Sequence, residues 1–162
     1  MSHEPELARV AAELTELERA RVAGELDEDG RDRRRRKIGE LLKLLERGGA
    51  ERRQYVRIPA DLEVGLRIDQ IRASCAAAEL SHGGLGLRGE LWVEEGALVL
   101  VENLRVGTRD YPMSARAKVV WKGPASAGLT FLDVDARNER QIRSVFEELF
   151  WLYVAQLAAP AR

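Results

Sequence analysis

The sequence contains few residues that support redox or metal chemistry. Its 162 residues include one cysteine, Cys75, and two histidines, His3 and His82. A single cysteine forms no internal disulfide, which agrees with a reducing compartment. Zinc sites in proteins use several cysteine, histidine or carboxylate ligands, and this sequence has neither a cysteine pair nor a histidine cluster. We therefore expect no metal site.

Long hydrophobic runs are also absent. No segment approaches the roughly 18 apolar residues of a membrane-spanning helix, and the densely charged residues 1–30 lack the apolar core of a signal peptide. The hydrophobic content of 45% and the charged content of 33% are typical of a globular protein. The net charge of −1 provides no general attraction to nucleic acid or to an anionic membrane. We therefore expect a cytoplasmic protein, free or docked on a partner.

Motifs of the common catalytic sites are missing. There is no GxSxG nucleophile turn, no Walker phosphate loop and no HExxH metal-binding helix. The glycines at 83, 84 and 86 precede a strand-like segment, whereas a phosphate-binding glycine loop precedes a helix. These absences favour a binding protein over an enzyme.

The N-terminal residues 1–49 are predicted to form a helical hairpin. Apolar residues recur at helical spacing in residues 4–26 and again in residues 31–47. The acidic run 27–30 ends in glycine and predicts a turn, while Gly48-Gly49 predicts the end of the second helix. A hairpin of this length does not bury its apolar stripes alone. It must pack on the rest of the chain, on a second copy in a homodimer, or on another protein.

From residue 50 onward the helical period gives way to the two-residue alternation of strands. Strands are expected near residues 62–68, 71–77, 85–87, 97–101, 115–121 and 127–131. The apolar run 97–101 predicts a strand that is buried on both faces, and residues 103–108 predict a turn. Trp121 alternates with Val119, which predicts the same face for both side chains. Several short strands separated by turns predict a closed or nearly closed antiparallel barrel.

The C-terminal part of the chain is predicted to be helical. Asp133 and Asp135 are candidate helix caps, and an apolar stripe runs from Ile142 to Tyr153. This stripe is expected to cover one side or end of the barrel. The fold class is therefore mainly β with α, with helices before and after the barrel.

Two short motifs carry the strongest functional signal. Arg53 and Arg57 stand just before the first predicted strand, and Ser81, Gly83 and Gly84 lie in a predicted turn. Arginine suits a nucleotide ligand because its planar fork forms paired bonds with phosphate or with the Hoogsteen edge of guanine, and its flat face stacks on a base. Glycine in the turn is expected to allow positive φ and a close approach of ligand to backbone. A serine hydroxyl and a nearby carboxylate can accept guanine N–H donors.

Together the two motifs resemble the bipartite signature of PilZ domains, which bind the second messenger cyclic di-GMP. Members carry RxxxR, followed further along the chain by [D/N]xSxxG. Arg53 and Arg57 match the first part, Ser81 and Gly84 match most of the second, and Glu79 stands where the family has Asp or Asn. The resemblance implies a six-stranded antiparallel barrel with a helix packed across it. The implied division is a helical extension (1–49), a barrel domain with its C-terminal helix (50–157) and a short tail (158–162).

The resemblance also implies which residues bind the ligand. An extra arginine directly before RxxxR, here Arg52, often accompanies a stacked pair of cyclic di-GMP molecules in the family. Trp121 is a candidate for stacking on a base, although packing at the barrel rim is the simpler role. No other cofactor is implied. The predicted ligand-binding residues are Arg52, Arg53, Arg57, Glu79, Ser81, Gly83, Gly84 and Trp121.

Glu79 is the one departure from the motif. It keeps a carboxylate but adds a methylene, which moves the acceptor by roughly 1 Å unless the rotamer compensates. A displaced charge-assisted hydrogen bond costs about 1.5–3 kcal/mol, or about ten- to hundredfold in affinity. Both weakened binding and loss of binding are compatible with this substitution.

Three functional hypotheses follow. The first is a cyclic di-GMP receptor or adaptor, in which ligand orders the arginine segment and changes docking of a protein partner, in motility, surface polysaccharide or secretion. The second is a PilZ-like interaction module that binds no nucleotide. The third is a nucleic-acid binder that uses the basic run 31–37. The third has little support, because residues 1–49 carry acidic and basic residues in nearly equal number and no DNA-binding motif is present.

Overall fold

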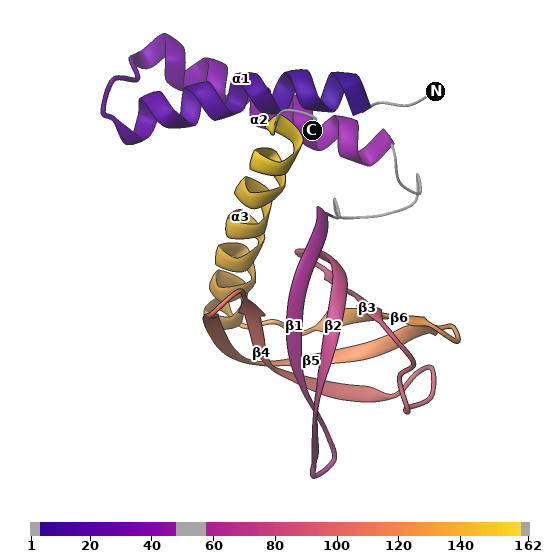
Figure 1. The fold of residues 1–162 in the computed structure, drawn as a ribbon. Coiled ribbons are helices and arrows are strands. Elements are labelled where there is room, and N and C mark those ends of the chain that lie inside the picture. The colour runs from indigo at the N-terminus through magenta and orange to yellow at the C-terminus, as the bar shows by residue number, and fades with distance from the viewer. Residues whose placement is uncertain (1–3, 48–57, 160–162) are drawn as a thin grey trace. The chain divides into compact units, whose positions relative to one another are not determined.

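The computed structural model describes residues 4–47 and 58–159 of the chain. These residues form three helices and six strands (Figure 1). The helices are α1 (Glu4–Val22), α2 (Glu28–Arg47) and α3 (Ala136–Ala158). The strands are β1 (Ile58–Ile68), β2 (Ile71–Ser81), β3 (Gly84–Arg88), β4 (Leu98–Val106), β5 (Arg109–Lys122) and β6 (Ser126–Leu132).

The strands close into an antiparallel barrel in the order β1-β2-β3-β6-β5-β4 (Figure 1). Four of the five connections join neighbours in this order directly, whereas residues 89–97 carry the chain from β3 to β4 across the barrel. The six-stranded antiparallel barrel with a C-terminal helix and preceding helices, predicted from the sequence, is confirmed.

The barrel interior is filled by the alternating apolar positions of the strands. Along β1, Ile58, Leu62, Val64, Leu66 and Ile68 are buried, while the residues between them, apart from Ala60, are at least partly exposed. Each such side chain contributes about 1.5–3 kcal/mol when it is fully removed from water. This alternation fixes the register, because a slip of one residue would turn the apolar set outward.

Strand β4 differs from the sequence-based expectation in two ways. Leu98 is 60% exposed and Leu100 is partly exposed, so the run 97–101 is buried on one face and not on both. The expectation of a turn at residues 103–108 is also wrong, because β4 continues to Val106 and the turn is confined to Gly107 and Thr108. A closed barrel without a second layer over this strand leaves its outer face in water, so an apolar run there does not report burial on both sides.

Helix α3 is attached to β5 by side-chain to backbone hydrogen bonds. The buried Asn138 accepts a bond from the Ser114 amide and donates one to the Ser114 carbonyl, both at 2.9 Å. One turn further along, the Gln141 amide donates to the Pro112 carbonyl. Asp135 caps the helix by accepting a bond from the Asn138 amide at 2.8 Å. These bonds fix the first turns of α3 along one strand of the barrel.

The end of α1 and the start of α2 have clear local signals, and these correct the predicted bounds. Gly24 has a φ of 73° and terminates α1 with the bonds of a Schellman motif, in which the Glu25 amide donates to the Ala20 carbonyl. The Asp27 carboxylate accepts a bond from the Gly30 amide at 2.7 Å, so Asp27 caps α2. The acidic run 27–30 is therefore the cap and first turn of α2, where the helix dipole favours negative charge, and not a turn between helices.

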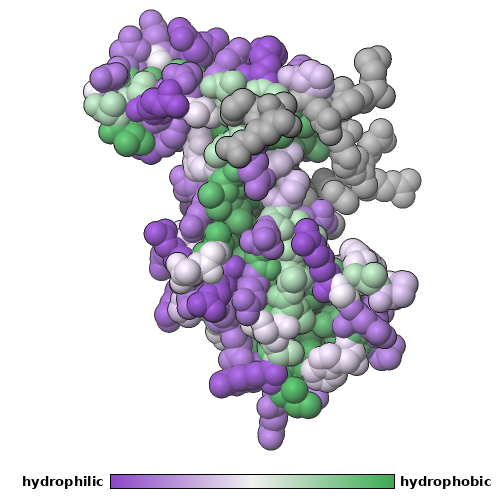
Figure 2. All heavy atoms as spheres, viewed as in Figure 1, coloured by the Kyte–Doolittle hydropathy of each residue, from purple (hydrophilic) through white to green (hydrophobic). Residues whose placement is uncertain are grey.

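The apolar stripes of α1 and α2 are buried within the chain itself. Val10 and Leu14 on α1 and Leu41 on α2 are fully buried, as is Val154 near the end of α3, at 1% exposure. The outward surface of this hairpin is mainly hydrophilic on the side seen in Figure 2. A second copy is therefore not needed to cover these residues, and the homodimer remains a prediction.

The basic run 31–37 is partly used for internal contacts. Arg34 donates to the Glu18 carboxylate at 2.8 Å and lies 5.1 Å from the centre of the Trp151 ring. Lys37 pairs with Glu13 at 2.6 Å. Arg31, Arg33, Arg35 and Arg36 are exposed.

The described residues group into two compact units. One unit contains α1, α2 and the end of α3 from Phe150 onward, and the other contains the barrel and α3 up to Leu149. The domain boundaries predicted from the sequence remain a prediction. None of the described helices is both long enough and apolar enough to cross a membrane.

Candidate functional site

The predicted turn between β2 and β3 is held together by the Ser81 side chain. Ser81 is only 5% exposed, and its hydroxyl oxygen accepts bonds from the amides of Gly83 and Gly84, both at 3.1 Å. The Gly83 carbonyl in turn accepts a bond from the Phe131 amide on β6 at 2.9 Å. The serine therefore shapes the turn through its own backbone, and a ligand contact of its hydroxyl stays a prediction.

Gly84 is required by close packing and not by its backbone conformation. Among the described residues, the glycines with positive φ are Gly24, Gly89, Gly96 and Gly107, so the expectation of positive φ in the turn is wrong. Instead, a Cβ on Gly84 would lie 2.0 Å from the Leu129 carbonyl oxygen. The absent side chain lets β3 approach β6 at this point.

A row of four register partners extends from this turn across the outer face of the barrel. Glu79 on β2 pairs with Gly86 on β3, Gly86 pairs with Gly128 on β6, and Gly128 pairs with Trp121 on β5. The neighbours of both glycines along their strands are buried core residues, so the glycines belong to the outer face of the barrel, where both are themselves buried. The row spans three interstrand spacings, about 14 Å. We call this surface the glycine face.

Two side chains fold onto the glycine face from its ends. A Cβ on Gly86 would lie 2.6 Å from the Glu79 Cγ and 2.9 Å from its Oε1, so the acidic side chain lies over that glycine. A Cβ on Gly128 would lie 2.0 Å from the Trp121 Nε1, so the indole lies over the second glycine. The extra methylene of Glu79 is thus accommodated by the absence of a side chain at Gly86.

β-Bulges direct both of these side chains outward. The register shifts between Ala77 and Glu79 on β2, and between Val119 and Trp121 on β5. An extra residue in a strand changes the face to which the following side chains point. For this reason Trp121 is 37% exposed on the outer face, and the predicted shared face of Trp121 and Val119 is wrong.

His82 connects the turn to helix α3. Its side chain is exposed at one edge, as expected for a turn residue, but its ring centroid lies 4.4 Å from that of Phe146. Partial burial lowers the pKa of His82 below its ordinary value of 6.5. Arg143 lowers the pKa further, while Glu139 opposes the shift. This contact could not be predicted from the sequence, because it joins residues far apart in the chain.

The structure thus brings together five of the eight predicted ligand-binding residues on one turn and one adjoining face: Glu79, Ser81, Gly83, Gly84 and Trp121. Arg52, Arg53 and Arg57 lie outside the described residues. Sequence reasoning missed Gly86 and Gly128. Their signal was a glycine inside an apolar strand pattern, which marks close approach of backbone or ligand.

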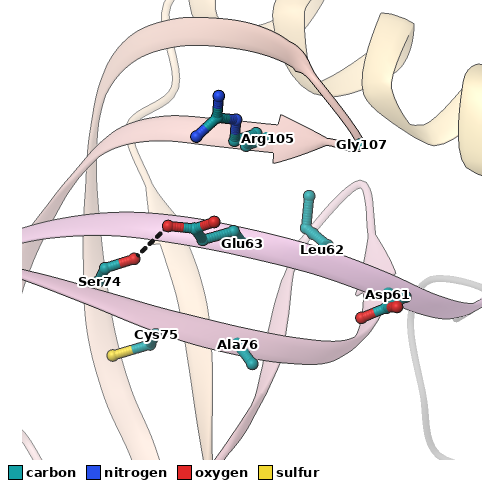
Figure 3. Close-up of a pocket in the computed structure, with 8 residues that line it drawn as sticks. All are labelled: Asp61, Leu62, Glu63, Ser74, Cys75, Ala76, Arg105 and Gly107. Atoms are coloured by element: carbon teal, nitrogen blue, oxygen red, sulfur yellow. Dashed lines mark hydrogen bonds between the residues drawn. The ribbon is translucent and has the colours of Figure 1, made fainter.

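A separate hollow lies on another part of the barrel, over β1, β2 and β4 (Figure 3). Its volume is about 470 Å³, and it is lined by Asp61, Leu62, Glu63, Ser74, Cys75, Ala76, Arg105 and Gly107. The Ser74 hydroxyl donates to the Glu63 carboxylate at 2.6 Å (Figure 3). None of the predicted ligand-binding residues lines it.

The chemistry of this hollow does not suit a nucleotide or a reactive thiol. Asp61 and Glu63 would repel phosphate, and Arg105 lies 3.6 Å from the carboxylate of Asp110. Burial raises the pKa of Cys75, which keeps its thiol protonated and weakly nucleophilic. The glycine face is therefore the better candidate site. Within the described residues, no group of three or more histidine, cysteine or acidic side chains is placed to hold a metal ion.

The structure is a small antiparallel barrel with the glycine face, which carries Glu79 and Trp121, beside the β2–β3 turn. The family model of the PilZ domain matches residues 51–148, which is more than half of the chain. The chain belongs to the PilZ domain family.

Several solved structures are similar to this chain. The PilZ domain of CeSA from a cellulose-synthesizing bacterium has 16% identity and a TM-score of 0.47, over 59% of this chain and 96% of that one. YcgR from Escherichia coli, in complex with c-di-GMP, has 20% identity and a TM-score of 0.48, over 61% of this chain and 46% of that one. The Bacillus subtilis inhibitor of motility MotI/DgrA has 21% identity and a TM-score of 0.46, over 61% and 54%. No curated protein matches the chain.

Close packing at Gly84 makes a testable prediction. Gly84→Ala is expected to lower the free energy of unfolding by at least about 2 kcal/mol, because its methyl group meets backbone that cannot rotate away. The matched control is Gly123→Ala, whose new Cβ would meet only ordinary contacts at 3.7 and 3.8 Å. The control should change stability by less than about 1 kcal/mol. Urea denaturation followed by circular dichroism measures both, and equal effects of the two variants would contradict the packing argument.

The lowered pKa of His82 predicts a pH-dependent stability. The unfolded chain binds more protons than the folded chain between the two pKa values, so the free energy of unfolding should fall as the pH is lowered through about 6.5. His82→Phe keeps a ring against Phe146 but does not titrate, and its stability should depend less on pH in this range. Thermal denaturation from about pH 7.5 to about pH 5.5 tests this. If the stability of the two proteins depends equally on pH, the pKa of His82 is not lowered in the folded state.

Proposed function

We propose that this protein is a receptor for cyclic di-GMP that binds the nucleotide at the β2–β3 turn and the adjoining glycine face. The observation that carries the proposal is the convergence of Glu79, Ser81, Gly84 and Trp121 in a chain of the PilZ domain family. Residues of the second motif, on β2 and its turn, share this surface with Trp121 on β5. The proposal describes a binding protein without catalytic activity, and it keeps the cytoplasmic location expected from the sequence.

Each residue is assigned a role that suits its chemistry. The indole of Trp121, which covers Gly128, is assigned to stacking on a purine base. The Glu79 carboxylate, which lies over Gly86, is assigned to the N–H donors of guanine. Ser81 keeps the turn in shape. Arg53 and Arg57 are assigned to phosphate and guanine, as the family motif implies.

We extend the proposal to stoichiometry and output. With Arg52 directly before the motif, a stacked pair of nucleotides is proposed as the bound form. Ligand binding would order the arginine segment and alter docking of a protein partner, in motility, surface polysaccharide or secretion. The helices α1 and α2, whose outward surface is charged, are the proposed place of that docking or of self-association.

A second candidate function rests on Glu79. Because the family has Asp or Asn at this position, the domain can also be read as an interaction module that does not bind nucleotide. The accommodation of the longer side chain over Gly86 favours the receptor. Glu79→Asp tests the position directly, since an altered affinity in either direction places the carboxylate at the ligand.

Calorimetric titration of cyclic di-GMP into the purified chain tests the receptor. Binding at micromolar or lower dissociation constant is expected, with about two ligands per chain if the stacked pair forms. The double variant Arg53→Ala/Arg57→Ala should lose at least about a hundredfold in affinity, because two charge-assisted contacts are removed. An unchanged melting temperature of the variant confirms that it is folded. No heat and no ligand-induced rise in the wild-type melting temperature would reject the receptor and support the interaction module.

A further inference from the structure

The pairing of the barrel's cations is uneven. The arginines of the described strands lie within 4.0 Å of a carboxylate, with the exception of Arg88. The paired ones are Arg67, Arg72, Arg105, Arg109 and Arg116. Arg88 and Lys118 are both exposed, and within the described part of the chain neither has a hydrogen bond or an ion pair.

Arg88 and Lys118 both border the glycine face. Arg88 follows Gly86 by two residues on β3 and pairs with Ser126, the residue two before Gly128. Lys118 pairs with Thr130, the residue two after Gly128. Side chains two residues apart on a strand share a face. Arg88 and Lys118 therefore lie on the same outer face as Glu79 and Trp121, on opposite sides of the glycine row, each about 7 Å from it along the strands.

The charge of this face is suited to an anion. Over β2, β3, β6 and β5, the three register rows that contain Gly84, Gly86 and Arg88 include one carboxylate, that of Glu79. The other arginines of the described strands are paired with carboxylates, as with the Arg72–Glu102 pair at 3.3 Å. An exposed unpaired cation is ordinary by itself, but two that flank the glycine row leave positive charge on both sides of the proposed ligand site.

From this placement we infer that Arg88 and Lys118 bind phosphate groups of the ligand from the two sides of the glycine row. The inference rests on the proposed function and deepens it, because it adds two residues outside the family motif to the site. Arginine can donate two parallel hydrogen bonds to one phosphate, and lysine provides a compact positive charge. Each side chain can therefore bind one phosphate group of the ligand. A base that stacks on Trp121 then lies between the two cations.

The test is calorimetric titration of cyclic di-GMP into Arg88→Gln, Lys118→Gln and the double variant at low and at high salt. Each single variant should weaken binding by about three- to tenfold, which corresponds to an exposed charge-assisted contact. The loss should shrink at high salt, where exposed charges are screened. Arg88→Lys and Lys118→Arg should retain most of the affinity. Melting temperatures should not change, because neither residue has a structural partner among the described residues.

The matched control is Arg72→Gln, an exposed arginine of the same barrel that is paired with Glu102. It should leave affinity unchanged. If Arg88→Gln and Lys118→Gln bind as the wild type does, or if Arg72→Gln weakens binding equally, the inference is overturned while the receptor stands. If the wild type does not bind cyclic di-GMP, the receptor and this inference fall together.

Discussion

The close approach of side chains to the backbone of Gly86 and Gly128 is the constraint on which the candidate site depends. A Cβ at either position would collide with Glu79 or Trp121, at 2.6 Å and 2.0 Å respectively. Since neither glycine has positive φ, their value lies in the missing side chain and not in an unusual backbone. The result is a surface on which the Glu79 side chain covers one glycine and the Trp121 indole covers the other. The indole can stack on a base, and the carboxylate can accept hydrogen bonds from the ligand.

The same surface is built into the barrel's own bonding. The Ser81 hydroxyl holds the turn, the Gly83 carbonyl binds β6, and the missing side chain at Gly84 lets β3 pair closely with β6. His82 in this turn lies against Phe146 of α3. A ligand that presses on the turn therefore acts on a segment that contacts both the β3–β6 strand pair and helix α3, so binding at the surface can affect that helix.

Much of the fold follows from the sequence, because the signals are local. The change from helical to two-residue period marked the strands, and the ExSxxG motif marked the turn between β2 and β3. The errors arose where tertiary pairing decides the outcome. The bulge that directs Trp121 outward leaves no mark in the alternation of β5. The run 97–101 is apolar throughout, although Leu98 and Leu100 lie on the outer face of β4, so the sequence alone predicts burial on both faces. Asp27 was assigned to a turn because a cap and a turn use the same residue types. Gly128 and Lys118 became candidates only when register placed them beside Gly86.

The central claim is that ligand binds on the glycine face, and nuclear magnetic resonance titration of the isotope-labelled protein with cyclic di-GMP tests it most directly. The account predicts the largest shifts at the amides of Gly84, Gly86 and Gly128 and at the indole N–H of Trp121, which is assigned by its disappearance in Trp121→Phe. Shifts concentrated instead around Asp61, Cys75 and Arg105, in the hollow over β1, β2 and β4, would contradict the account and move the site to that side of the barrel.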